Sequence, residues 1–338
     1  MYYPSYELTV GSKTYTPSQA KVSSIRVKCG LGPKVDTLEV TFTRDEETEK
    51  VRKGESVLVK LGYEESLSTV FTGTVDLVEK NFRLVKVSAL NQAFHLSLYR
   101  LNRVYLNQSA GNITSDILDS LNEKLAEGKF GELKKGTIMD GIVHPYYVIS
   151  DRMCAYEHIS RLAEKCNYVC YTSPEGFFNF KAYERGEPHT LKYGENVIDA
   201  SLVKLFNTSG DVKVYGESPS MWAGRETYHW LGKKGYVGIE SESPAFGGGV
   251  HEIVLKDYSV KDGDTAAKVA QNVRRRTKRD FMTVLKVLGD EKVKVNDTIK
   301  VENMPGPQEK IELQVVEVEH YISFGEGFIS IFGGMEAE

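Results

Sequence analysis

The sequence has little cysteine, no long hydrophobic run and no excess of one charge. Its 338 residues include 4 cysteines, and 43 Lys and Arg stand against 47 Asp and Glu, a formal net charge of -4. Four cysteines are too few for a disulfide scaffold in a chain of this size. The near balance of charge excludes a global field that would draw the chain to nucleic acid or to an anionic membrane. We therefore expect no membrane partner, and a local basic patch is the remaining route to an anionic partner.

Targeting and membrane segments are absent as well. No apolar run approaches the roughly 18 residues of a membrane span, and Met1–Tyr6 has neither the basic nor the apolar part of a signal peptide. These absences predict a soluble protein made in the cytoplasm. The thiols are expected to be buried and free, since Cys154 and Cys166 share the spacing of the apolar residues Ile159 and Leu162.

Signatures of catalysis, metal binding and cofactor binding are also missing. The seven histidines form no HxxxH or HxH pair, GxSxG is absent, and Gly247–Gly249 lacks the Lys-Ser/Thr ending of a phosphate loop. Acidic runs such as Asp45–Glu47 and Glu64-Glu65 resemble paired glycosidase carboxylates, but their polar surroundings favour solvated loops. The sequence predicts no catalytic, metal or cofactor site, and a protein that is not an enzyme.

What the sequence does contain is a mainly β chain with a few helices, which is the α+β class. In residues 1–100, short runs rich in Val, Thr, Leu and Tyr are separated by turns such as Gly11-Ser12 and Lys53–Glu55. Strands this short must close or stack their sheet to bury one face. We expect strands at Tyr6–Tyr15, Lys21–Cys29, Thr37–Thr43, Ser56–Tyr63, Val70–Lys80 and Arg83–Ala89.

Residues 101–197 have a different character, with two helical patterns followed by a hairpin. Ile117, Leu118, Leu121 and Leu125 follow helical spacing after an N-cap residue, and a second apolar stripe follows Asp151. We expect a helix capped by Thr114 or Ser115, a helix from Asp151 to a C-cap at Asn167, and a hairpin that turns at Ser173–Gly176.

Residues 198–338 return to strands after an irregular excursion at 217–249. A third helix opens at Asp262–Thr265, and strands are expected at Met282–Leu288, at Thr298–Glu302 and as a long pair between Glu312 and Phe332. The chain is thus predicted to hold a first β-module (residues 1–100), an α+β insertion (residues 101–197) and a second β-module (residues 198–338).

Two segments far apart in the chain resemble each other. Gly54–Lys60 leads after a loop to the strands of Phe71–Ser88, and Val295–Val301 leads by a similar step to the strands of Leu313–Ile331. Each segment is a polar turn, a strand that begins at a small polar residue, a loop and a hairpin. We interpret this echo as a duplicated β-module and expect the two copies to share one strand order.

This order of modules resembles the late control protein D family of phage tails, the baseplate hub also found in the N-terminal part of VgrG spike proteins. The resemblance covers most of the chain. It is strongest at Leu101–Ser109 with the helix that follows, at Val148–Lys165 with the hairpin ending at Phe180, and at Asp262–Asn272. These are degenerate hydrophobic patterns whose specificity lies in their order.

The resemblance implies two tube-like β-barrel modules flanking the small α+β insertion. It implies a homotrimer whose pseudo-hexameric ring joins a six-fold tail tube to a three-fold spike, with tube, spike and other baseplate proteins as partners. Such a particle would be assembled in the host cytoplasm as part of a virion tail or a tail-like injection particle, and nucleic acid would be a partner only in transit if at all. The resemblance carries over no catalytic residue. A cell-wall-degrading tail hydrolase is the alternative, and a nucleic-acid-binding β-barrel module is a second one.

Two groups of residues are candidates for assembly contacts. A basic run at the end of the third helix has more cations than the helix dipole needs, which leaves a solvated helix end, an acidic protein partner or DNA as its role. Ring contacts are expected from the alternating strands of the echo, in which half of the side chains face the core. The candidate ring and tube residues are Val57, Val59, Thr72, Thr74, Ile299, Val301, Val316 and Val318, and the basic run is Arg274, Arg275, Arg276, Lys278 and Arg279.

Overall fold

The computed structural model describes most of the chain. The described residues are 3–32, 35–64, 66–204, 212–216, 237–240, 253–257, 259–260, 263–277, 279, 281–304 and 310–337, with the backbone alone at 237–240. The helices are α1 (Phe94–Leu98), α2 (Ala110–Glu127), α3 (Ala155–Cys166) and α4 (Gly263–Thr277). The strands are β1 (Pro4–Val10), β2 (Lys13–Tyr15), β3 (Val22–Gly30), β4 (Thr37–Thr43), β5 (Ser56–Tyr63), β6 (Ser66–Lys80), β7 (Leu84–Leu90), β8 (Arg103–Ser109), β9 (Lys134–Ile138), β10 (Val143–Ile149), β11 (Tyr168–Thr172), β12 (Phe177–Ala182), β13 (His189–Lys192), β14 (Val197–Lys204), β15 (Val212–Gly216), β16 (Val237–Glu240), β17 (Ile253–Asp257), β18 (Phe281–Leu288), β19 (Thr298–Glu302), β20 (Lys310–Ser323) and β21 (Gly327–Glu336).

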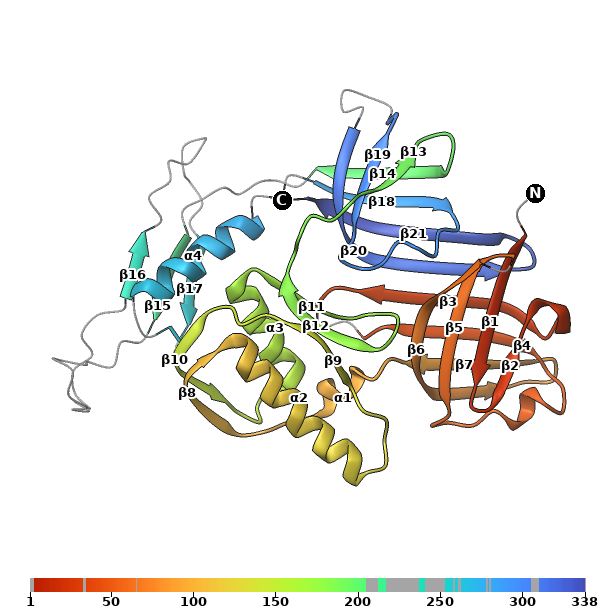
Figure 1. The fold of residues 1–338 in the computed structure, drawn as a ribbon, viewed down its shortest axis with the longest axis horizontal. Helices are drawn as coiled ribbons and strands as arrows, with labels where there is room; N and C mark the ends of the chain where they lie inside the picture. Colours follow the sequence, from red (N-terminus) through yellow and green to blue (C-terminus); the bar gives the residue numbers. More distant parts are fainter. Residues whose placement is uncertain are drawn as a thin grey trace.

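Thirteen strands from both ends of the chain form one continuous sheet (Figure 1). The order along the sheet is β14-β18-β21-β20-β3-β4-β7-β6-β5-β1-β2, and β19 and β13 branch from β20. The two β-modules are therefore joined edge to edge by the pairing of β20 with β3. The pairings among the described residues do not return from β2 to β14, so closure of either module into a tube-like barrel stays a prediction.

Alternation along the strands builds the core under this sheet. In β4, Leu38, Val40 and Phe42 are buried while the residues between them are not. The same hydrophobic core includes Leu285 of β18 and Phe332 of β21. The two β-modules thus share one continuous core and not only a sheet.

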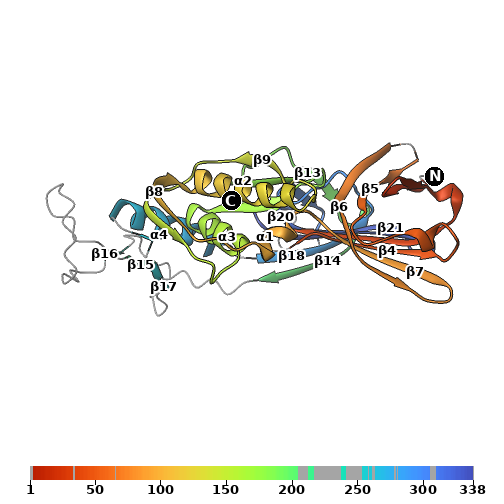
Figure 2. The same cartoon turned by 90° about the horizontal axis from the view of Figure 1, so that it is seen from below.

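A second core lies at the other end of the molecule, where the helices are (Figure 2). It joins the apolar faces of α2 and α3 to the three-stranded sheet β11-β12-β9 and to the antiparallel pair β10-β8. Val212 of β15 and Val269 and Ala270 of α4 belong to this core too. Residues 198–338 therefore contribute to both cores, and the domain boundaries stay a prediction.

The insertion contains the two predicted helices and the predicted hairpin, but the starts of both helices differ from the prediction. α3 begins at Ala155 and not at Asp151. The side chain of Ser109 accepts a hydrogen bond from the Asn112 N–H at 3.0 Å and caps α2. The predicted cap at Thr114 or Ser115 is wrong, because both residues lie inside the helix. α3 ends, as predicted, at Asn167, which has a left-handed φ of 54°. The hairpin of β11 and β12 turns at Ser173–Gly176, as predicted.

All four cysteines are buried and free, as the sequence predicts. Burial raises the pKa of Cys166 to about 11 and that of Cys170 to about 12, so both thiols stay protonated near neutral pH. Within the part of the chain that the structure describes, no helix is long and apolar enough to cross a membrane. The excursion expected at 217–249 lies outside the described residues except for β16.

Candidate assembly surface

The two β-modules repeat the same strand order. Strands β3, β4, β5, β6 and β7, here called the first repeat, lie side by side as β3-β4-β7-β6-β5. Strands β14, β18, β19, β20 and β21, here called the second repeat, lie side by side as β14-β18-β21-β20-β19. All eight pairings within the repeats are antiparallel. The predicted duplication is confirmed in its strand order.

The repeats also share two of their irregularities, although a third, at Val70 in the pairing of β5 with β6, occurs in the first repeat alone among the described pairings. Ser23 is an extra, bulged residue in the pairing of β3 with β4, and Ile198 is bulged in the pairing of β14 with β18. Asp76 of β6 and Val316 of β20 are bulged at the matching place against β7 and β21. A β-bulge bends its strand at a defined residue, so these coincidences fix the correspondence residue by residue.

The pairing of β3 with β20 joins the two repeats inside the chain. Residues Glu317–Ser323 of β20 pair antiparallel with Ser24–Gly30 of β3. On the face of the sheet away from the core, Glu319 accepts ion pairs from Lys28 at 3.2 Å and Arg26 at 3.4 Å. This strand pairing and its cross-strand charges, together called the internal junction below, hold the first repeat to the second.

Two edges of the repeats have no strand beside them. Among the described residues, nothing pairs with Asp76–Lys80 of β6 on the side opposite β7, although the matching part of β20 pairs with β3. β14 lies at the end of the strand path and pairs with β18, and its one other pairing within the described chain is an isolated bridge between Val197 and Tyr193. The side chains of Ile198 and Val203 in β14 are about half exposed, at 50% and 53%. The chain therefore presents two open edges, one along β14 at the end of the sheet and one along Asp76–Lys80 of β6, beyond the part that pairs with β5.

The ring and tube residues chosen from the sequence lie mainly in the core. Five of them, Val57, Val59, Ile299, Val301 and Val318, are at most 3% exposed. The other three are half-buried. The hydroxyl of Thr74 accepts from the Gln92 side chain at 2.8 Å, Thr72 lies near the turn at Gly176, and Val316 lines the groove described below. Contacts of these strands with a neighbouring subunit stay a prediction, and burial leaves few of these side chains able to make them.

The basic run divides into two parts. Arg274, Arg275 and Arg276 lie in the last turn of α4, as the sequence predicts. Arg279 lies beyond the helix and is half-buried, and its guanidinium donates to the side-chain oxygen of Gln314 at 2.9 Å. Arg279 therefore ties the run to the second repeat, whereas Arg275 and Arg276 are exposed. Lys278 lies outside the described residues.

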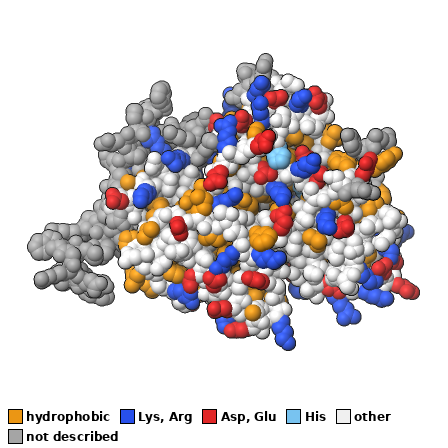
Figure 3. Space-filling view, viewed as in Figure 1, with side chains coloured by type: hydrophobic (Ala, Val, Ile, Leu, Met, Phe, Trp, Pro, Cys, Tyr) orange, Lys and Arg blue, Asp and Glu red, His pale blue; other side chains and the backbone are white. Residues whose placement is uncertain are grey.

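A groove of about 600 Å³ runs beside this basic run. Its wall carries Arg275, Arg276 and Arg279 from the run and the acidic Glu164 and Glu317 from α3 and β20. On the rest of the visible face, basic and acidic side chains are interspersed (Figure 3). The groove is therefore the part of this structure where the predicted basic run meets an opening.

Of the acidic runs noted in the sequence, Asp45–Glu47 is engaged by lysines, and Glu65 lies outside the described residues. Lys21 binds both Asp45, at 3.0 Å, and Glu47, and Lys13 binds Glu47 at 2.9 Å. These carboxylates hold β-strands and a turn together and are not arranged as a pair across a cleft. In the portion that the structure describes, no group of three or more His, Cys, Asp or Glu could hold a metal ion.

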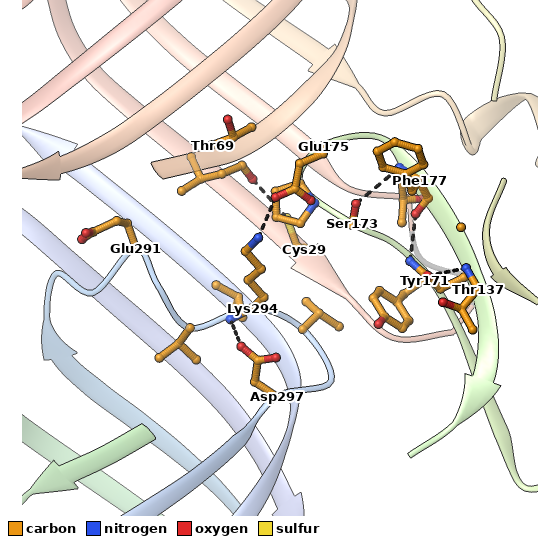
Figure 4. A pocket seen from close by; sticks show the side chains of 18 of the residues that line it. Cys29, Thr69, Thr137, Tyr171, Ser173, Glu175, Phe177, Glu291, Lys294 and Asp297 are labelled. Carbon is orange, nitrogen blue, oxygen red and sulfur yellow. Dashed lines mark hydrogen bonds and ion pairs between the residues drawn. The ribbon is translucent and has the colours of Figure 1, made fainter. Parts of the chain in front are cut away.

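A cavity of about 460 Å³ lies where the two repeats meet the insertion (Figure 4). Lys294, in the loop between β18 and β19 of the second repeat, binds Glu175 of the β11–β12 turn at 2.6 Å. The backbone N–H of Lys294 donates to the Asp297 side chain at 2.8 Å. Burial raises the pKa of Glu175, but Lys294 and Ser173 outweigh burial and the net shift is downward. Burial lowers the pKa of the nearby His320 to about 4, so this imidazole is neutral. The cavity walls thus join the insertion to the second repeat through the Lys294–Glu175 ion pair.

The open edges were missed from the sequence. β14 reads Val-Ile-Asp-Ala-Ser-Leu-Val-Lys, in which apolar residues do not alternate regularly with polar ones. The signal was the echo itself, since β14 is the counterpart of β3 and could have been aligned to it.

Comparisons with known proteins bear on the fold. No family model matches the sequence, and no curated protein matches it either. Among solved structures, the 43 kDa tail protein of prophage MuSo2 from Shewanella oneidensis matches 98% of this chain and 98% of its own, with a TM-score of 0.70 at 16% identity. A tail protein from Neisseria meningitidis MC58 matches 99% of this chain and 97% of its own, with a TM-score of 0.70 at 12% identity.

A third similar structure comes from a secretion system. The E. coli c3393 protein, described as a component of the type VI secretion system with structural similarity to the T4 tail proteins gp27 and gp5, matches 98% of this chain and 77% of its own, with a TM-score of 0.60 at 10% identity. At these identities the likeness concerns the backbone alone. The chain therefore has the fold of these phage tail proteins over nearly its whole length.

Proposed function

We propose that the protein is the structural baseplate hub of a phage tail or of a tail-like contractile injection particle. In this role three copies form a ring that joins the six-fold tail tube to the three-fold spike. The observation that carries the proposal is the repeat: two modules with one strand order and two matching bulges lie edge to edge in a single sheet. Three chains with two such modules each present six nearly equivalent units to a six-fold partner.

The similar structures support this proposal through their fold. Two of them are named as tail proteins and one as a component of a type VI secretion system. The work of such a protein is geometric and needs no catalytic group. In the proposal, each repeat closes into a tube-like barrel only when its open edges meet those of the next subunit, which accounts for the open path of pairings in one chain.

The basic run is the proposed contact for another baseplate protein. Arg275 and Arg276 are exposed beside the groove of about 600 Å³, where an acidic segment of a tube, spike or baseplate partner would be attracted. Arg279 also lines this groove, but it is half-buried and bonded to Gln314, so Arg275 and Arg276 are the better placed for the contact.

The experiment that tests the proposal is a count of subunits. Sedimentation velocity over a range of concentrations should show monomer and trimer, and electron microscopy of the trimer should show a ring with six similar lobes. Quantitative mass spectrometry of purified particles should find three copies per tail. A stable dimer at all concentrations, or a particle with a copy number that is not three, would contradict the hub assignment.

A further inference from the structure

The two open edges are the counterparts of the two strands that pair at the internal junction. The bulges align β3 with β14, so that Ser23 corresponds to Ile198, and align β6 with β20, so that Asp76 corresponds to Val316. β20 pairs with β3 within the chain. The counterpart of that pairing would join β6 to β14, but β14 begins the path and six strands separate it from β6. Such a pairing can therefore form only between two copies of the chain or by closing the whole sheet.

The core-facing residues of β14 and β6 are less buried at the open edges than their counterparts at the internal junction. At the internal junction, Val27 of β3 is 0% exposed and Val318 of β20 is 3% exposed. Their counterparts, Leu202 of β14 and Val78 of β6, are 36% exposed and half-buried. The residues that face the core are thus sealed where two strands meet and partly open where the edge is free. An apolar edge of this kind is a template for pairing with another strand.

The edge of β14 carries little that would prevent such pairing. Natural edge strands are protected by proline, by lysine in the strand or by a covering element. β14 contains no proline and has a single lysine, Lys204, at its end, while Ile198, Leu202 and Val203 are exposed. Its backbone groups on the side away from β18 have no strand partner within the described chain.

We propose that β14 of one copy pairs antiparallel with the free edge of β6 in the next copy, in the register of the internal junction. The proposal rests on the proposed ring and supplies its joint. Transfer of the observed pairs Glu319–Lys28 and Val318–Cys29 places Glu79 opposite Val203 and Val78 opposite Lys204 of the neighbour. The contact is heterologous, with different surfaces on its two sides, and repeats head to tail until the ring closes.

The side chains at this joint differ from those at the internal junction. There Glu319 is bound by Lys28 and Arg26. At the joint between copies, Val203 of β14 takes the place that Lys28 has at the internal junction. Leu77 of β6, which is 49% exposed, lies diagonally across the strand pair from Val203. An apolar contact thus replaces an ion pair on this face. Trimer formation is therefore expected to depend weakly on salt concentration.

A disulfide tests the register directly. Directly opposite residues of an antiparallel pair have Cα atoms about 4.5–5.5 Å apart, within the range of a disulfide. The full chain with Glu79→Cys and Val203→Cys, kept in a glutathione redox buffer, should form covalent dimers and trimers. The matched control is Glu79→Cys with Asp199→Cys, on the same strand and face but four residues away, which is about 13 Å. This control and the parent chain, with its buried thiols, should stay free of intermolecular disulfides.

A charge series tests the same pair without cysteine. Val203→Glu places a like charge opposite Glu79 in the joint and should weaken trimer formation roughly tenfold over three joints. Adding Glu79→Lys to this variant should restore the trimer. Val203→Lys should preserve or strengthen it, because the pair then copies Glu319–Lys28. Both residues are exposed in the single chain, so circular dichroism should show the same fold in every variant.

The possible outcomes distinguish a failure of the β6–β14 joint from a failure of the proposed trimeric ring. A trimer that is indifferent to Val203→Glu, or that cross-links only in the control pair, would overturn the β6–β14 joint while leaving the hub proposal standing. Folded protein that never trimerises and enters no particle would overturn both. Restoration by the charge swap, together with the expected disulfide, would establish the joint and its register.

Discussion

Gly54 and Asn296 occupy the same place in the two repeats. Both have left-handed backbones, with φ of 90° and 75°. The N–H of Gly54 donates to the carbonyl of Val75, and that of Asn296 donates to the carbonyl of Val315, both at 2.8 Å. The polar turns of the echo therefore have the same conformation. The left-handed position is held by glycine in the first repeat and by asparagine in the second, and these residues tolerate a left-handed backbone best and next best.

The turn at Gly54 should be sensitive to backbone strain alone. A Cβ at this position would meet no atom within 4 Å, so Gly54→Ala tests only the left-handed conformation. We expect the free energy of unfolding to fall by about 1–2 kcal/mol, measured by urea denaturation. Gly54→Asn, which copies the second repeat, should lose less. Gly186→Ala, in open space without a left-handed φ, is the control and should change stability by less than about 0.5 kcal/mol.

The ion pair between Lys165 of α3 and Asp257 of β17 should hold the second core together. The pair is 2.7 Å long, and Lys165 also donates to Ser259 at 2.6 Å. Burial raises the pKa of Asp257, but Lys165 and Ser259 outweigh it and the pKa is lowered. Lys165→Met leaves a largely buried carboxylate without its cation and should cost about 2–4 kcal/mol in urea unfolding.

A surface pair provides the comparison. Lys192 and Glu195 are 3.6 Å apart, with side chains that are 44% and 64% exposed. Lys192→Met should therefore change the free energy of unfolding by less than about 0.5 kcal/mol. Equal losses in the two methionine variants would show that the Lys165–Asp257 pair does not stabilise the second core.

Asp36 should make the protein less stable as pH rises. Its carboxylate accepts from the Gly30 N–H at 3.1 Å and from the Asn91 side chain at 2.6 Å. Burial nevertheless raises its pKa from 3.8 to about 7. Between these two values the folded chain holds a proton that the unfolded chain has lost, so stability falls as pH rises through this window and is level above it. From pH 5 to pH 8 the loss is expected to be about 2–3 kcal/mol.

Asp36→Asn isolates this group from the others that titrate. The substitution keeps the shape, and the buried carbonyl oxygen of Asn91, which has no hydrogen-bond partner among the described atoms, can turn to accept from the new amide. The free energy of unfolding of the variant, taken relative to that of the parent, should therefore be higher at pH 8 than at pH 5. Parallel stability curves across this range would show that Asp36 does not keep its proton in the fold.

The sequence revealed the repeats and helices but not which edges stay open. The polar turns at Gly54 and Asn296, the C-cap at Asn167 and the alternation in β4 are local signals, and local signals suffice for elements of this kind. The ring residues chosen from the echo, such as Val57 and Ile299, are the most regularly apolar positions, and that regularity marks the core. An open edge is defined by the absence of a neighbour, which depends on pairings between residues about 300 positions apart, such as those of β3 with β20.

The surface against which α4 packs could not be predicted from the sequence, for a similar reason. Its stripe of Val269, Ala270 and Val273 predicts a helix with one buried face, and the structure has that helix. No pattern in the stripe says which apolar surface it will meet. α4 packs against α3 in the second core, although it precedes β18 of the second repeat in the chain. The end of this helix, and with it the basic run, is therefore placed over the insertion.

The basic run should separate assembly from stability when its two parts are changed. Arg275 and Arg276 are exposed, so Arg275→Gln with Arg276→Gln should lower the free energy of unfolding by less than about 0.5 kcal/mol per site. Arg279→Gln breaks the bond to the buried Gln314 side chain, which itself donates to Asn296 at 2.8 Å, and should lower the free energy of unfolding by about 1–3 kcal/mol.

If the exposed pair binds an acidic partner, the double variant should fold normally and enter particles poorly, measured by its copy number in purified tails. The opposite pattern, normal incorporation with impaired folding, would make the whole run an internal support and exclude the partner contact.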